Sequence, residues 1–404
     1  MRVQSIRVKN YKALRDVEIR DMPGFVVFVG ANGTGKSTLI DLFSFLRDCL
    51  KDNARAAFDR RGGFRQVRSR GAGEDETIQI ELKIDLDFRT EDKRRIVTYA
   101  VELAADGTKV VIEREILSWR RGSSGRPFHF IDFERGHGVA IAESFDAFDT
   151  EVKDADLKRE EQALDRPDLL ALKGLGQFRR FDAASQLRDL IENWQVCDFH
   201  ITEARREPEA APAEHLSPSG DNLALYAQYL RDYHPGVFKQ IVQAMAKRVP
   251  GISAVMTEPT GDGRVLLRFR DASFEDGFIA RLVSDGTIKM FAYLALLHDP
   301  APHPLLCIEE PENQLYPSLM GVLAEEFAAY AERRNGQAQV FVTTHSPDFL
   351  NAVSLSSIYW LRKEDGYTKV NRADDDAQLR AFVAEGDQPG WLWRQGLFRG
   401  ADPK

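Results

Sequence analysis

The stretch VFVGANGTGKSTLIDLF, residues 27–43, limits the possible fold of this 404-residue chain more than any other feature. Its residues from Gly30 to Ser37 match the pattern G-x-x-x-x-G-K-[ST] at every fixed position. An apolar run precedes the match and a helix-forming run follows it, so the segment predicts a strand, a tight turn and a helix.

Such a loop is suited to phosphate. Its glycines let backbone N–H groups turn toward phosphate oxygens, and the N-terminus of the following helix adds its dipole. Lys36 then reaches the β and γ phosphates, and the hydroxyl of Ser37 ligands Mg²⁺. The sequence therefore predicts binding of ATP with Mg²⁺. Binding without hydrolysis stays open as an alternative.

Strands are predicted on both sides of this loop and its helix. Two short ones, over residues 2–10 and 14–22, come before it. After it, apolar side chains recur at every second residue from Ile78 to Phe88, which is the period of a half-buried strand. Asp106-Gly107 suits a hairpin turn. We expect an antiparallel meander over residues 77–142.

The middle of the chain changes character. Residues 150–195 are charged and predicted to be helical, without the sustained heptads of a long coiled coil. An exposed loop rich in proline and alanine is expected over 203–221. Helices near 222–232 and 236–247 follow, and then a hairpin. From residue 281, short apolar strands alternate with helices, as in a buried parallel sheet.

These patterns predict an α/β fold whose head is built from both ends of the chain, with a mixed parallel sheet and an antiparallel meander. The expected divisions are an N-terminal lobe over 1–148, an inserted helical region over 149–249, a C-terminal lobe over 250–365 and a tail over 366–404.

Composition narrows the class of partner. The net charge is -8, so the molecule is not a basic nucleic-acid coat, and any contact with nucleic acid must come from a local patch. The three cysteines form no CxxC pair, which argues against a zinc cluster and for reduced thiols in the cytoplasm. Neither a signal-peptide core nor an apolar run near the ~20 residues of a membrane span is expected.

A second candidate site lies in LLCIEEPE, residues 305–312, where Glu309 and Glu310 follow an apolar strand. One carboxylate there can hold Mg²⁺ and the other can polarise the attacking water, because adjacent strand residues point to opposite faces. Aspartate is usual at the metal position, and Glu309 is longer by one methylene. A solvated charged turn is the weaker interpretation, because Pro311 follows directly.

Two further motifs have ordinary explanations when taken singly. Ser284 and Gly286 in VSDGT open an apolar helix, as a helix cap does, and His345 in TTHSPDFL fits a buried histidine. Taken in order with the glycine loop and the acidic strand end, they resemble the ATP-binding cassette (ABC) heads of the SMC–RecF type. The likeness is greatest to the ATPase half of the overcoming-lysogenisation-defect (OLD) class and its AAA-type relatives.

The resemblance, which extends from the first strand to about residue 365, implies roles for matching residues. Glu309 matches the Mg²⁺ carboxylate, Glu310 the catalytic base, and His345 the switch histidine that senses the γ-phosphate. Catalysis would rest on the last two together with Lys36. The nucleotide-binding Walker A positions are Gly30, Asn32, Gly33, Gly35, Lys36, Ser37 and Thr38.

The resemblance also implies a homodimer. Ser284 and Gly286 match the signature motif, which in such families touches the γ-phosphate held by a second protomer, and residues 313–317 match the dimer-facing loop. The signature Ser-Asp-Gly-Thr differs from the Ser-Gly-Gly-Gln of transporters and argues against a transporter subunit. For the glutamine loop, Gln66 is only a candidate. The implied mechanism is an ATP sandwich that hydrolysis releases.

Residues 60–70, RRGGFRQVRSR, carry several arginines and no acid. They suit either a phosphate-binding surface for DNA or RNA or a solvated loop near the nucleotide, and the sequence favours neither. The aspartates at 374–376 fit an exposed loop better than a metal site. OLD-class nucleases carry a TOPRIM domain after the head, and too few residues follow the last core strand here for one. We therefore expect a separate effector.

Three functions remain as hypotheses. The first is an ATPase switch that controls a partner effector, such as a nuclease or toxin in anti-phage defence. The second is a DNA repair or recombination ATPase of the RecF type. The third is a scaffold that binds nucleotide and assembles with little turnover, against which the intact acidic pair and switch histidine count.

Overall fold

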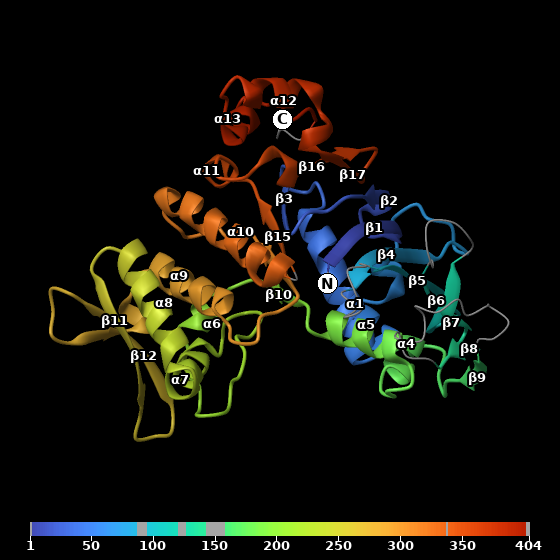
Figure 1. The fold of residues 1–404 in the computed structure, drawn as a ribbon, viewed down its shortest axis with the longest axis horizontal. Coiled ribbons are helices and arrows are strands. Elements are labelled where there is room, and N and C mark those ends of the chain that lie inside the picture. The colour runs from blue at the N-terminus through green and yellow to red at the C-terminus, as the bar shows by residue number, and fades with distance from the viewer. Residues whose placement is uncertain (1, 87–94, 120–126, 143–157, 337, 401–404) are drawn as a thin grey trace.

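The computed structural model describes residues 2–86, 95–119, 127–142, 158–336 and 338–400 (Figure 1). The N-terminal strands and helix α1 form one lobe, and helices α7 to α9 with strands β11 and β12 form the other. A central sheet, which includes strands from the N-terminal and the C-terminal parts of the chain, lies between the two lobes. In the described part of the chain, no helix combines the length and apolar composition that a membrane crossing needs.

The central sheet has the strand order β10-β14-β15-β3-β16-β17, all parallel except for the final antiparallel pair. Every residue of β3 is buried, as expected for a strand covered on both faces. This arrangement confirms the α/β class. The bounds are β3 Phe25–Val29, β10 Gln195–Cys197, β14 Leu305–Glu309, β15 Gln339–Thr344, β16 Ile358–Glu364 and β17 Tyr367–Arg372.

The second sheet is antiparallel, with the order β2-β1-β4-β5-β6-β7-β8-β9. The expected meander over 77–142 is therefore present, and the first hairpin extends it because β1 pairs with β4. The bounds are β1 Arg2–Tyr11, β2 Leu14–Ile19, β4 Ile78–Leu86, β5 Arg95–Asp106, β6 Lys109–Trp119, β7 Phe128–Glu134, β8 His137–Ile141 and β9 Arg159–Ala163.

Strand β9 corrects the prediction that residues 150–195 are helical. Its sequence, REEQA, has no strand propensity, but backbone pairing with β8 holds it at the sheet edge, with Arg159 and Glu161 exposed. Helices α4 (Ala171–Leu175) and α5 (Asp182–Glu192) do follow. Residues 150–157, and the predicted boundary at 148, lie outside the described residues.

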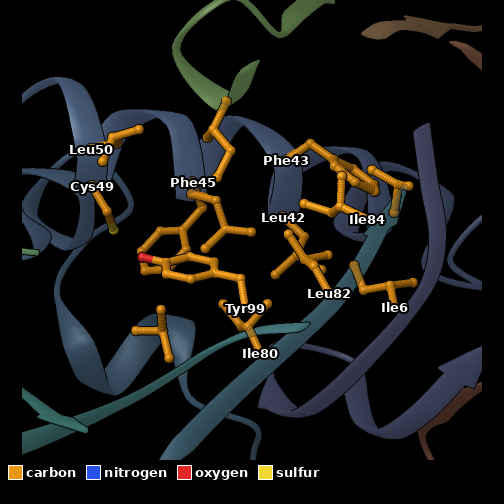
Figure 2. Close-up of a cluster of buried hydrophobic side chains, with 14 of the residues drawn as sticks. Ile6, Leu42, Phe43, Phe45, Cys49, Leu50, Ile80, Leu82, Ile84 and Tyr99 are labelled. Atoms are coloured by element: carbon orange, nitrogen blue, oxygen red, sulfur yellow. The ribbon is translucent and has the colours of Figure 1, made fainter. Parts of the chain in front are cut away.

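Helix α1 (Lys36–Lys51) packs between the two sheets. Figure 2 shows Leu42 and Phe45 of α1 opposite Leu82 of β4 and Tyr99 of β5. On the other side, the ring of Phe43 lies 5.2 Å from that of Phe341 in β15. Burial of one such side chain is worth about 1.5–3 kcal/mol. Packing on both faces therefore fixes the helix that begins at the phosphate loop.

The other lobe buries a separate core against the opposite face of the central sheet. Helix α9 lies at its centre, with every residue from Thr287 to Leu297 buried. The bounds are α6 Ile201–Ala204, α7 Leu223–Tyr233, α8 Pro235–Arg248, β11 Ile252–Pro259, β12 Val265–Asp271, β13 Gly277–Ile279, α9 Asp285–Leu297 and α10 Met320–Gly336.

The C-terminal tail docks on the head. Its helices α12 (Ala377–Ala384) and α13 (Pro389–Arg394) lie together at the top of Figure 1, and α13 packs against α11 (Pro347–Leu350). The ring of Phe398 lies 5.7 Å from Trp360 of β16. The predicted division at residue 365 falls in the β16–β17 hairpin. Asp374 and Asp375 lie in a short 3₁₀ turn. Asp376 caps α12, because its carboxylate accepts a hydrogen bond from the backbone N–H of Gln378.

A buried carboxylate joins the antiparallel sheet to α4. Glu115 of β6 accepts hydrogen bonds from the hydroxyl of Tyr99, at 2.9 Å, and from the first backbone N–H groups of α4, those of Ala171 and Leu172. Burial raises the pKa of Glu115 to about 7, well above the ordinary glutamate value. The carboxyl group of Glu115 therefore holds its proton more tightly in the folded protein than in the unfolded chain.

This shift predicts a pH dependence of stability. At pH values below the pKa that Glu115 has in the unfolded chain, the raised pKa stabilises the folded state to its full extent. This stabilisation is lost as pH rises through about 7. Between about pH 5 and about pH 8, the free energy of unfolding should fall by roughly 2 kcal/mol more in the wild type than in Glu115→Gln. Denaturant unfolding at the two pH values measures the difference, and parallel pH profiles for the two proteins would contradict it.

Candidate active site

The phosphate loop is held in shape from two directions. Gly35 has a φ of 102°, in the left-handed region, and a Cβ there would lie 2.2 Å from the hydroxyl oxygen of Thr368 in β17. That hydroxyl donates a hydrogen bond to the carbonyl of Thr34 at 2.7 Å. A Cβ on Gly30 would lie 2.7 Å from the backbone oxygen of Leu361 in β16. Glycine is thus required at both fixed positions of the motif.

Lys36 lies under this loop and is only 5 % exposed. Its ammonium donates hydrogen bonds to the carbonyls of Gly30 at 2.8 Å and Ala31 at 3.3 Å. Burial lowers the pKa of Lys36, against the attraction of nearby carboxylates, of which Glu310 lies 3.9 Å away. The two carbonyls therefore hold a desolvated cation at the place where phosphates would enter. Asn32, Gly33 and Ser37 are exposed at the rim of the loop.

Ser37 and Glu309 come together between the start of α1 and the end of β14. The hydroxyl of Ser37 lies beside the Glu309 carboxylate, whose pKa burial raises. A hydroxyl and a carboxylate supply the oxygen ligands that Mg²⁺ prefers. The two side chains therefore have the chemistry of Mg²⁺ ligands. Neighbouring Thr38 is half-buried in the first turn of the helix.

Glu310 and His345 face one another from the ends of β14 and β15. The backbone of Glu310 has a φ of 39°, and its N–H donates to the carbonyl of Thr343 at 3.0 Å. This left-handed turn aims the Glu310 carboxylate toward Lys36 and His345, whose Nδ1 lies 3.7 Å from it. The imidazole is 48 % exposed. An acid and an imidazole that share one open edge of the site suit proton transfer from water.

Glu312, which the sequence motifs did not single out, holds the end of β15 in place. It accepts hydrogen bonds from the backbone N–H of His345 at 2.7 Å and from the hydroxyl of Thr344 at 2.8 Å. It also lies 3.3 Å from Nδ1 of His345. Its place two residues after the acidic pair was a signal, but only the fold shows the contact with β15.

The signature residues lie apart from this cluster. Figure 1 shows α9, which Ser284 caps, in the lobe away from α1. The hydroxyl of Ser284 contacts Thr287 in its own turn, and a Cβ on Gly286 would lie 3.1 Å from the backbone oxygen of Gln314. Among the described residues, no hydrogen bond or ion pair joins either residue to the phosphate loop.

A buried lysine couples the signature helix to the loop after β14. Lys289 is 3 % exposed, and its ammonium donates to the carbonyl of Asn313 at 2.9 Å. The side chain of Asn313 in turn donates to Glu310 at 3.2 Å. A lysine within an otherwise apolar helix was a detectable sign of such a partner, because an unpaired buried charge is costly. Residues 313–317 therefore bridge the signature and the acidic strand end.

The arginine-rich segment is largely engaged within the protein. Arg61 binds Asp41 and Asp48 and is 10 % exposed, while Arg68 donates to the carbonyl of Gly73. These contacts favour the solvated-loop interpretation for residues 60–70, part of which forms helix α3, Phe64–Val67. Gln66 accepts a hydrogen bond from Arg70 at 2.7 Å, and nothing in the structure adds to its candidacy for the glutamine loop.

The two left-handed glycines of the loop give a matched pair of variants. Alanine at either position is strained, because both backbones are left-handed. At Gly35 its Cβ would also overlap Thr368, whereas no atom lies within 4 Å of a Cβ at Gly33. We expect Gly35→Ala to bind ATP about tenfold more weakly, or worse, than Gly33→Ala. Titration calorimetry with ATP and Mg²⁺ tests this, and equal affinities in two folded variants would contradict it.

Comparisons with known proteins agree with the fold. The chain is 26% identical over 145 residues to the DNA replication and repair protein RecF of Heliobacterium modesticaldum, a match that spans 33% of this chain and 37% of that protein. An Smc head bound to the C-terminal winged-helix domain of ScpA covers 92% of this chain and 98% of its own, at 14% identity and a TM-score of 0.57.

Another solved structure is an Smc head domain with an extended coiled coil, bound to the C-terminal domain of ScpA derived from Pyrococcus furiosus. Its match covers 95% of this chain and 99% of its own length, at 14% identity and a TM-score of 0.52. The predicted likeness to SMC–RecF heads is thus confirmed, whereas nothing in the comparisons singles out the OLD class. A family model matches residues 25–351. This match covers most of the chain, which belongs to the family described as "AAA domain, putative AbiEii toxin, Type IV TA system".

Proposed function

We propose that this chain hydrolyses ATP at a site that a second copy of itself completes, and that the resulting dimer acts as a switch. The observation that carries the proposal is the separation of Ser284 from Lys36. The cluster around Lys36 supplies groups for phosphate, metal and water, and Glu310 and His345 are partly exposed on its open side. A signature motif from another protomer would fill that side.

Each residue near the loop has a defined task in this mechanism. The Lys36 ammonium and the first N–H groups of α1 neutralise the β and γ phosphates. Ser37 and Glu309 would hold Mg²⁺, which supplies further charge neutralisation when bound. Glu310 accepts a proton from the attacking water, and His345 contacts the γ-phosphate while Glu312 fixes its position.

Exposed apolar side chains beside the signature support a dimer face. Leu282, just before Ser284, is 70% exposed, and Tyr316, in the loop after β14, is 73% exposed. Both flank the coupling between Lys289 and Asn313. Large apolar groups around a polar motif are typical of protein–protein contacts. The proposed interface therefore surrounds the residues that would reach the partner's nucleotide.

The output of the switch is proposed from the family. Its description names a toxin system, which supports control of a separate effector, such as a nuclease or toxin in cytoplasmic anti-phage defence. The similarity to RecF supports a second candidate, an ATPase of DNA repair or recombination. DNA-stimulated ATP hydrolysis that falls steeply with salt would favour the second candidate over the first.

Removal of the proposed base should trap the dimer. Glu310→Gln retains the shape of the side chain but accepts no proton, so we expect ATP hydrolysis to fall by at least about 100-fold. Light scattering should then give a dimer with ATP and Mg²⁺, and a monomer without nucleotide. Lys36→Ala is the control that should stay monomeric. A monomer of Glu310→Gln under saturating ATP would argue against the sandwich.

Mixing two inactive variants tests whether the site is shared. Lys36→Ala removes the phosphate grip, and Ser284→Arg blocks the signature, so each homodimer has no intact site. A mixed dimer would join the intact loop of one protomer to the intact signature of the other. Equal mixing should restore ATPase activity to at most about half of the wild-type value, because each mixed dimer has one working site of two.

No recovery in that mixture, with both variants folded, would contradict a site shared between protomers. Turnover also separates the switch from a scaffold that binds nucleotide without useful hydrolysis. A wild-type rate no greater than that of Lys36→Ala would favour the scaffold.

A further inference from the structure

A cluster of His215, Asp299 and His303 lies outside the nucleotide site. The first residue comes from the loop before α7, and the other two from the turn that joins α9 to β14. Their candidate ligand atoms all lie within 4.8 Å of one another. We propose that these three side chains bind a zinc-class divalent ion.

His303 is the strongest indication. The side chain is 9% exposed, and Nδ1 donates a hydrogen bond to the carbonyl of Asn193 at 3.0 Å. A neutral imidazole with its proton on Nδ1 carries its lone pair on Nε2. That Nε2 is buried, and none of the described residues donates a hydrogen bond to it. An Nδ1–H bound to a backbone carbonyl, with a free Nε2, is the usual arrangement of a metal-binding histidine.

Asp299 is fixed beside it. Its carboxylate is 1% exposed. One oxygen accepts from the backbone N–H of Ala301 at 2.8 Å, and the other lies 2.9 Å from Nδ1 of His215. The carbonyl of His303 accepts from the Tyr330 hydroxyl at 2.9 Å, so the turn is held at both ends. Two of the ligands are therefore positioned in advance, on a turn that Pro300 and Pro302 stiffen.

His215 closes the cluster from the solvent side. Its side chain is 46% exposed, and its ring centroid lies 5.3 Å from that of His303. Asn222 holds the loop by donating to the carbonyl of His215 at 2.9 Å. A hydrogen-bonded pair of His215 and Asp299 is the simpler explanation of those two residues. It leaves the buried Nε2 of His303 without a purpose, and an ion would satisfy all three.

The donor set selects the class of ion. Two imidazoles and one carboxylate suit Zn²⁺ and its neighbours, with water as a fourth ligand on the open side, whereas Mg²⁺ and Ca²⁺ prefer oxygen alone. The cysteines, whose spacing excludes a thiolate zinc cluster, take no part in this site. A bound ion would join the 215 loop to the turn between the signature helix α9 and β14, which ends at Glu309.

The test uses the untagged 404-residue chain, stripped with a chelator and then supplied with excess Mg²⁺ and ATP so that the phosphate site is saturated. Co²⁺, a spectroscopic substitute for Zn²⁺, is added and its visible absorption followed, and bound Zn²⁺ is counted by native mass spectrometry. The variants are His215→Gln and His303→Gln. His200→Gln is the control, because it removes an exposed histidine that lies 3.5 Å from Asp198.

The wild type and His200→Gln should each bind one ion with the strong absorption of tetrahedral Co²⁺. His215→Gln should bind at least about 10- to 100-fold more weakly, the range known for loss of even an outer-shell partner. His303→Gln should lose the absorption. Because His215 is half exposed, its variant is expected to fold normally, which circular dichroism checks. A wild type that binds no ion, or equal binding by wild type and His215→Gln, would overturn the proposal.

Discussion

Hydrogen bonding between parallel strands sets the geometry on which the candidate site depends. β14 pairs with β15 so that Glu309 lies opposite Thr343, and β15 pairs with β3 so that Thr344 lies opposite Val29. The three strands therefore end at one edge of the sheet, within a residue of each other. A slip of one residue in either pairing would turn the acidic pair or His345 away from the phosphate loop. Helix α1 packs against β14 and β15, with Phe43 on Phe341, and so opposes such a slip.

Charge balance is the second organising principle of this edge. Two buried lysines, Lys36 and Lys289, lie among the carboxylates of Glu309, Glu310 and Glu312. Burial lowers the pKa of both lysines and raises that of Glu309, so desolvation alone disfavours the charges on these three residues. They persist because they lie beside one another and beside backbone carbonyls. A polyanion with its metal ion enters a site where opposite charges are already present in fixed positions.

Local patterns predicted most of the fold and much of the site. The alternation from Ile78 to Phe88 gave the meander, and the glycine spacing gave the loop, because both depend on neighbours in sequence. Strand β9 escaped prediction because only its pairing with β8 makes REEQA extended. The same holds for Glu312 and Thr368, whose contacts join segments far apart in the chain. Sequence showed which residues have the right chemistry, and tertiary pairing decides which of them meet.

The position of β3 also has a consequence for how the protein is made. Both of its neighbours in the sheet, β15 and β16, are encoded after residue 338, so this wholly apolar strand leaves the ribosome long before either one. At 5–20 residues per second, the wait lasts roughly 15–60 s. During translation the phosphate loop has no sheet to hold it, and the exposed strand is prone to aggregation. The sheet around β3 therefore forms only after residues beyond 338 have been made, and until then the phosphate loop lacks the strands that hold it in the folded protein.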